Sequence, residues 1–224
     1  MTAFIDKLYL THKNFWSKSN LLLLSGSVVW FLSALVVQRL ASGYVGNYAT
    51  TTPVGDLLLD NLPTVNLDFF IIYSTLTVTL GIISLLIIYP KYLPFSLKAL
   101  ALFIIIRSFF FSLTHLGINL HQITLNMDSI GFNIYDFFYN AKNDLFFSGH
   151  VGVSFLFALI FWKEKLWRYV FFIISGIFGV SMILAHMHYS IDVFAASFIT
   201  YSIFIIATKL FKKDFALLSW NTIA

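Results

Sequence analysis

Residues 69–89 read FFIIYSTLTVTLGIISLLIIY, an apolar run that contains no charged side chain. A helix needs about 20 predominantly apolar residues to cross the hydrocarbon core of a bilayer. The run shows no strict alternation of polar and apolar residues, so it does not fit a strand of a membrane barrel. An α-helix satisfies its backbone hydrogen bonds internally, which lipid requires of a spanning segment. The stretch therefore predicts an all-α integral membrane protein.

Five other apolar runs extend this prediction to the rest of the chain. They span approximately residues 21–40, 97–116, 145–162, 169–186 and 191–209. The chain of 224 residues is 59% hydrophobic and 11% charged, and a soluble domain could not cover so much apolar surface with so few charges. We predict a single domain over residues 1–224 with six transmembrane helices. The first run is too long for a usual signal-peptide core, so it is expected to remain uncleaved.

The basic residues indicate how these helices cross the membrane. With a cytoplasmic N-terminus, eleven of the fourteen Lys and Arg fall on the cytoplasmic side: Lys7, Lys13, Lys18, Lys91, Lys98, Lys163, Lys165, Arg168, Lys209, Lys212 and Lys213. This asymmetry follows the positive-inside rule, so both termini are predicted to be cytoplasmic. The same anchoring explains the net charge of +4 without nucleic acid as a partner. The predicted location is the plasma (inner) membrane with the outer loops facing outward, or an organelle membrane with those loops in the lumen.

Two segments place histidine in or beside long apolar runs. Residues 144–150 read DLFFSGH, and residues 185–192 read AHMHYSID. Such an imidazole is costly unless it is paired or lines a wet cavity. The topology derived from Lys and Arg puts both segments at the outer ends of helices, although the histidines had no part in that assignment. We therefore predict an active site at the outer face of the membrane.

The spacing of His188 and Asp192 predicts a nucleophile and its orienting group. Residues four apart lie side by side on a helical turn, so the carboxylate is expected next to the ring. A carboxylate that accepts from one ring nitrogen fixes the tautomer and makes the other nitrogen a better nucleophile. Alternatively, Asp192 or Ser190 could simply cap the last helix.

Three further groups near residue 150 suit a phosphoryl group. Ser148 and Gly149 precede a helical run, where backbone N–H groups and a missing side chain favour an anion. A protonated His150 could donate to a leaving oxygen as a general acid. Arg107 offers bidentate donors to phosphate oxygens, although it could instead pair with Asp68 or Asp128 for structural reasons.

Taken together, these residues resemble the lipid-phosphatase superfamily related to the type-2 phosphatidic acid phosphatases. The closer resemblance is to its sphingomyelin synthase branch. Residues 144–150 are similar to the second conserved block of that branch, and residues 184–193 are similar to the third, including the second histidine at His186. Arg107 resembles the arginine of that branch's third span, so the resemblance covers about residues 107–193.

The resemblance implies a role for each matching residue. His188 would attack the lipid phosphorus with support from Asp192, and His150 would protonate the leaving alcohol. The remaining substrate-binding or phosphate-binding candidates are Arg107, Ser148, Gly149, His186, Tyr189 and Asp144. Neither a metal nor a cofactor is implied.

Two departures distinguish the chain from the plain phosphatase branch. No Lys and Arg-Pro signature occurs within residues 90–143. The Ser-Arg pair that precedes the nucleophilic histidine in that branch corresponds here to Ser181 and Met182. The missing arginine favours the synthase-like branch.

The sequence thus predicts a lipid phosphotransferase that moves a phospho-headgroup from a phospholipid donor to a lipid alcohol such as ceramide or diacylglycerol. With water as acceptor, the same residues would give a lipid phosphatase or a phospholipase C-like hydrolase. A non-catalytic transporter or lipid-binding protein is a third hypothesis, disfavoured because the ionisable groups gather at one face and no internal repeat is visible. A serine hydrolase using Ser148 is disfavoured because the strand-turn-helix setting of a nucleophile elbow is missing.

Overall fold

The computed structural model describes residues 9, 11–13, 15–48, 52–139 and 145–218. The helices within these ranges are α2 (Lys18–Asn47), α3 (Asp68–Ile88), the 3₁₀ turn η1 (Pro90–Tyr92), α4 (Leu93–Thr114), α5 (Ile130–Tyr139), α6 (Gly149–Ile160), α7 (Lys165–Leu184), α8 (Ser190–Leu210) and α9 (Lys212–Leu218). The described part of the chain contains no strand beyond an isolated bridge between Thr52 and Leu116. The prediction of an all-α integral membrane protein is confirmed.

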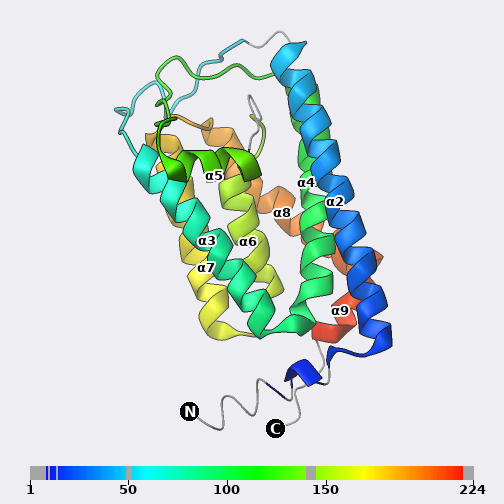
Figure 1. Cartoon of the computed structure of the whole chain (residues 1–224). Helices are drawn as coiled ribbons and strands as arrows, with labels where there is room; N and C mark the ends of the chain where they lie inside the picture. Colours follow the sequence, from blue (N-terminus) through cyan, green and yellow to red (C-terminus); the bar gives the residue numbers. More distant parts are fainter. Residues whose placement is uncertain (1–8, 10, 14, 49–51, 140–144, 219–224) are drawn as a thin grey trace.

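Five helices are long and apolar enough to cross a membrane. They are α2, α3, η1 with α4, α7 and α8, and together with α6 they run up and down along one bundle axis (Figure 1). Since α2 extends over 30 residues, it continues beyond both ends of the run predicted for it. Six complete spans are not confirmed, because the fourth predicted run, residues 145–162, contains only the 12-residue helix α6.

Helix α6 is shorter than its apolar run because part of that run forms the site instead of a helix. Residues 145–148 are not helical, and Phe147 adopts a positive φ of 26°. At about 1.5 Å per residue, twelve residues span roughly 18 Å, well below the approximately 30 Å hydrocarbon core. Most of α6 is buried, packed chiefly against α7 and α8. Protein therefore replaces lipid around this helix, so it does not need a full spanning length.

Close packing fixes the depth of α6 between its neighbours. A Cβ atom on Gly152 would lie 2.6 Å from ring carbons of Phe103 on α4 and 2.9 Å from Oγ1 of Thr200 on α8. Real side chains do not tolerate such distances, so only glycine allows three helices to meet at this level. His150 lies two residues earlier, at the first turn of α6. The contact at Gly152 thus sets where the histidine lies between α4 and α8.

The two ends of the bundle differ in composition. Figure 1 shows the start of α2, η1, the α6–α7 connection and α9 at one end, whereas α5 and the long loops lie at the other. The first end carries Lys18, Lys91, Lys163, Lys165 and Lys212. The second end carries the starts of α6 and α8, where the histidine motifs lie.

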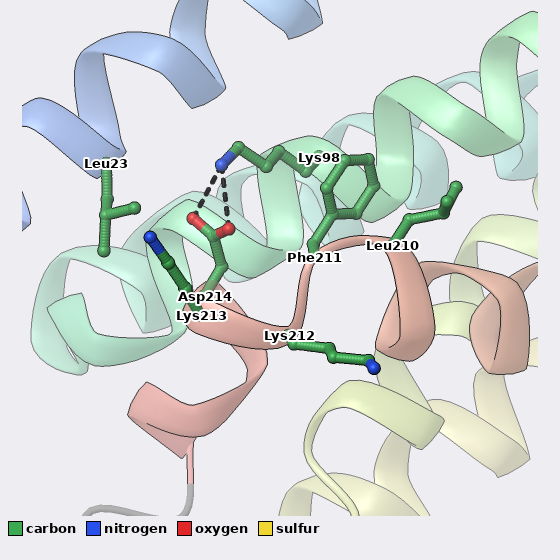
Figure 2. Close-up of a pocket in the computed structure, with 7 residues that line it drawn as sticks. All are labelled: Leu23, Lys98, Leu210, Phe211, Lys212, Lys213 and Asp214. Carbon is green, nitrogen blue, oxygen red and sulfur yellow. Dashed lines mark hydrogen bonds and ion pairs between the residues drawn. The ribbon is translucent and has the colours of Figure 1, made fainter.

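A pocket of about 340 Å³ opens at the basic end (Figure 2). Its lining residues are Leu23, Lys98, Leu210, Phe211, Lys212, Lys213 and Asp214. Lys98 Nζ donates to both carboxylate oxygens of Asp214 at 2.8 Å, which ties α9 to α4. Because this pocket lies at the other end of the bundle from the histidines, it is not the candidate active site.

Backbone hydrogen bonds hold the long loops against the end of α7. Val65 N–H donates to the carbonyl of Leu184 at 2.8 Å, and Ile123 N–H donates to the carbonyl of Ala185 at 3.2 Å. Residues 57–62 form turns. The connection between α4 and α6 contains α5, which lies across the end of the bundle (Figure 1).

Candidate active site

The first turn of α8 brings His188 and Asp192 together. His188 Nδ1 lies 3.4 Å from Asp192 Oδ2, and both side chains are buried. The same oxygen accepts the backbone N–H of Tyr189 at 3.3 Å. Asp192 therefore both caps the helix and contacts the ring, so the two roles considered for it are not alternatives. An imidazole whose Nδ1 carries the proton toward a carboxylate keeps the lone pair of Nε2 for chemistry.

Backbone contacts join the segment before α6 to this turn. Ser148 N–H donates to the main-chain carbonyl of Asp192 at 3.0 Å. The preceding residue, Phe147, is fully buried, and its positive φ turns its carbonyl toward Arg107 Nε at 3.0 Å. A non-glycine residue in this region of φ is strained, and such strain persists where surrounding contacts enforce it. The two motifs are thus one structural unit.

The guanidinium group of Arg107 lies at the N-terminus of α6. A Cβ atom on Gly149 would be 3.5 Å from Arg107 Cζ, which is ordinary contact distance. The side chain is 7% exposed and also lies over the ring of Phe111, with 5.8 Å from Cζ to the ring centroid. A buried cation next to the N–H groups of a helix start is a favourable environment for an anion.

His150 meets these groups from the first turn of α6. The charges of His188 and Arg107 lie within electrostatic range of its ring. Nε2 lies 3.2 Å from the hydroxyl group of Tyr135, and the ring packs edge-on against Phe178 at 5.5 Å between centroids. The structure therefore brings together side chains from α4, α6 and α8. The two that are most distant in sequence, Arg107 and Asp192, are 85 residues apart.

The remaining predicted residues lie differently. The side chain of Ser148 is fully buried, and its Oγ has no hydrogen-bond partner among the described residues. His186 is also buried; its Nδ1 lies 3.2 Å from Thr64 Oγ1, and its ring faces His121 at 6.5 Å. These contacts direct His186 toward the loops. Asp144 lies outside the described residues.

The hydroxyl group of Tyr189 forms hydrogen bonds with the backbone of two loops. Its hydroxyl group donates to the carbonyl of Gly117 at 2.8 Å and accepts the N–H of Val54 at 3.2 Å. Gly117 N–H in turn donates to the carbonyl of Thr52 at 2.8 Å. These contacts place two long loops over the start of α8, which indicates a positioning role for Tyr189.

Sequence reasoning missed Asp56, whose carboxylate caps α8 from another part of the chain. Oδ2 accepts the N–H of Ser190 at 2.7 Å and its hydroxyl group at 2.8 Å. Oδ1 accepts the N–H groups of Leu58 and Leu59. Burial alone would raise the pKa of Asp56, but these hydrogen bonds outweigh it and lower the pKa below 3.8. The spacing to Leu58 is typical of an Asx turn, but no signal in the sequence connects Asp56 with Ser190.

Acidification is expected to weaken this docking. Because the folded-state pKa of Asp56 lies below the unfolded value of 3.8, its carboxylate stabilises the fold above that value, and the stability is lost as the pH falls through the folded-state pKa. Asp56→Asn should remove about 1–2 kcal/mol at neutral pH and flatten the acid dependence. The unfolding temperature in detergent, followed from neutral to acidic pH, measures both effects. Asp128→Asn, at an exposed carboxyl on the same end, is the control. An equal acid dependence in both variants would contradict the assignment.

Within the described part of the chain, no group of three or more His, Cys, Asp or Glu lies close enough together to hold a metal ion.

Residues 143–209 match the family model described as PAP2 superfamily C-terminal. The match supports membership of the type-2 phosphatidic acid phosphatase superfamily. The matched range contains both histidine motifs and runs through α6, α7 and nearly all of α8. Comparisons with curated proteins and with solved structures give no match. Similarity to this superfamily over residues 143–209 suggests an enzyme of the lipid phosphatase or phosphotransferase type that acts on membrane lipids.

Proposed function

We propose that the protein is a membrane lipid phosphotransferase of the sphingomyelin synthase-like kind, which moves a phospho-headgroup from a phospholipid to a lipid alcohol. The observation that carries this proposal is the meeting of the His188–Asp192 pair with His150 and Arg107 at one end of a membrane bundle. A nucleophile, its orienting carboxylate, a proton donor and an anion site are the groups that phosphoryl transfer to histidine requires.

In the first step, His188 Nε2 forms a bond to phosphorus while the phosphorus–oxygen bond to the diacylglycerol breaks. In its protonated form, His150 gives its proton to the departing oxygen, so diacylglycerol leaves as a neutral alcohol. Asp192 stabilises the positive charge that develops on the His188 ring. The headgroup phosphate remains on His188 as a phosphohistidine.

In the second step, the acceptor hydroxyl attacks phosphorus and the phosphorus–nitrogen bond breaks. His150 now takes the acceptor's proton and returns to its starting charge, as microscopic reversibility requires. Arg107 and the first N–H groups of α6 offset the negative charge on the phosphate oxygens in both steps. The same residues thus act both when the first alcohol leaves and when the second alcohol attacks.

Met182 argues against a plain phosphomonoesterase and favours the synthase-like branch. It is fully buried on α7, at the position that corresponds to an arginine in the plain phosphatase branch. A buried thioether supplies no charge for a phosphate monoester, which carries more negative charge than the diester of a phospholipid. The second candidate function, a lipid phosphatase or phospholipase C-like hydrolase, is equally compatible with the superfamily match, which does not separate the two branches.

A single assay distinguishes these functions. Purified protein is incubated with headgroup-labelled phospholipids, with and without ceramide or diacylglycerol. A transferase yields a new headgroup-bearing lipid only when the acceptor is present. A hydrolase releases a water-soluble phosphate or phosphoalcohol under both conditions. If neither product forms with any donor headgroup tested, the proposed chemistry is wrong and lipid binding or transport becomes the working hypothesis.

We further propose that the chain crosses the membrane six times, with both ends in the cytoplasm and the site facing outward or into a lumen. The lysines at the bundle end opposite His150 support this orientation. Because the native chain has no cysteine, single cysteine substitutions can report the orientation. A membrane-impermeant maleimide should label Leu120→Cys in intact cells of the source, and Lys163→Cys only after the membrane is opened. The reverse pattern would overturn the orientation.

A further inference from the structure

Helix α5 lies over the histidine cluster and presents two different faces. Residues four apart share a face of a helix. Gly131 and Tyr135 form the inward face and are both buried. Ile130 and Ile134 form the outward face and are 79% and 46% exposed. The helix therefore has one side on the protein and an apolar side that the described part of the chain does not cover.

The start of α5 is fixed to α3. A Cβ atom on Gly131 would lie 2.8 Å from Cζ of Tyr73, so the backbone of α5 rests directly on that ring. Ser129 Oγ accepts the N–H of Phe132 at 3.0 Å and closes the first turn. One turn later, Tyr135 reaches His150. The helix is anchored at one end and touches the candidate acid with its next turn.

The contact between Tyr135 and His150 occupies a ring nitrogen that the reaction could use. The phenol oxygen lies 3.2 Å from Nε2, and the two rings are nearly parallel, with 17° between their planes and 6.1 Å between centroids. A general acid must be within about 2.6–3.2 Å of the oxygen that receives its proton. The hydroxyl group of Tyr135 stands where such an oxygen would have to be.

We propose that α5 is a lid over the site, and that the Tyr135 hydroxyl group holds the place on His150 that the leaving oxygen of a lipid takes. Ile130 and Ile134 then contact the boundary between lipid headgroups and acyl chains, where an apolar helix face is stable. A lipid that enters the site exchanges one hydrogen bond on Nε2 for another, and α5 shifts at its Tyr135 end. This inference rests on the proposed function, because it uses His150 as the acid.

Tyr135→Phe tests the exchange, since it removes the hydroxyl group and keeps the ring. The variant should show a KM for the donor lipid about 2- to 10-fold lower, the range that one net hydrogen bond supplies. The value of kcat should change less than KM, because no atom of the transfer step is lost. Tyr73→Phe is the matched control: the same change, on the residue that supports α5, whose hydroxyl group has no hydrogen bond to the described residues. An unchanged KM with a kcat more than tenfold lower would assign Tyr135 to proton transfer and overturn the lid.

A second measurement does not need turnover. Diethyl pyrocarbonate acylates a free imidazole nitrogen, and peptide mass spectrometry resolves His150 from the other histidines. Acylation of His150 should be about 2- to 10-fold faster in Tyr135→Phe than in the wild type or in Tyr73→Phe, because one hydrogen bond on the ring is gone. Equal rates in all three proteins would overturn the contact. Faster acylation in a protein that is inactive on every lipid would retain the contact and reject the proposed function.

Discussion

Replacement of His188 by alanine is expected to abolish transfer of the phospho-headgroup, with kcat lower by roughly a thousandfold or more. The variant loses the nitrogen that would form the phosphorus–nitrogen bond, and no neighbouring group replaces it in the same position. Incubation with a phosphorus-labelled donor should give an acid-labile, base-stable phosphohistidine in the wild type and none in His188→Ala. Headgroup transfer and trapping of the labelled protein measure the two effects separately.

His186→Ala is the matched control for this experiment. The two histidines are two residues apart and both are buried, but His186 contacts Thr64 and His121 instead of Asp192. Its loss should lower activity by about tenfold or less, through looser docking of the loops over α8. If His186→Ala abolished the phosphohistidine and His188→Ala retained it, the assignment of the nucleophile would be wrong.

The sequence could predict those parts of the structure that depend on local periodicity. The apolar runs identified α3, α4, α7 and α8 within a few residues, because lipid requires such runs to be helical. The spacing of four residues between His188 and Asp192 predicted their contact, since it depends only on one helical turn. The resemblance to the superfamily depended mainly on two short motifs, residues 144–150 and 184–193, which can be read directly from the sequence. It agrees with the match over residues 143–209. The sphingomyelin synthase branch stays a prediction.

The features that the sequence did not reveal depend on what surrounds each segment. The run from 145 to 162 is mostly apolar on both sides of residues 148–150, so composition could not show that protein rather than lipid encloses the helix in it. Helix α5 is only ten residues long, too short for its period to emerge from a polar loop. The contact between Asp56 and Ser190 joins residues 134 positions apart. All three features depend on tertiary contacts, which leave no local pattern in the sequence.

Asp192→Asn is expected to lower kcat by roughly a hundred- to ten thousandfold while the protein stays folded. An asparagine side chain has the same shape, and its carbonyl oxygen can still accept the N–H of Tyr189, which Asp192 Oδ2 accepts at 3.3 Å. The helix cap therefore survives. The same carbonyl oxygen still faces His188 Nδ1, because Asp192 Oδ2 serves both contacts. The amide lacks the negative charge that stabilises the developing cation on His188, so the attacking ring is left without its counter-charge.

Thermal unfolding in detergent separates this chemical effect from a structural one. Asp192→Asn should unfold within a few degrees of the wild type, and its phosphohistidine should form slowly rather than not at all, because His188 is still present. Asp56→Asn serves as the comparison, since that carboxylate also caps the first turn of α8 but binds Ser190 and lies on the loop side. We expect Asp56→Asn to reduce stability more than activity and Asp192→Asn to do the opposite. If both variants lost stability and activity in the same proportion, Asp192 would act only as a helix cap, and the orienting role proposed for it would be excluded.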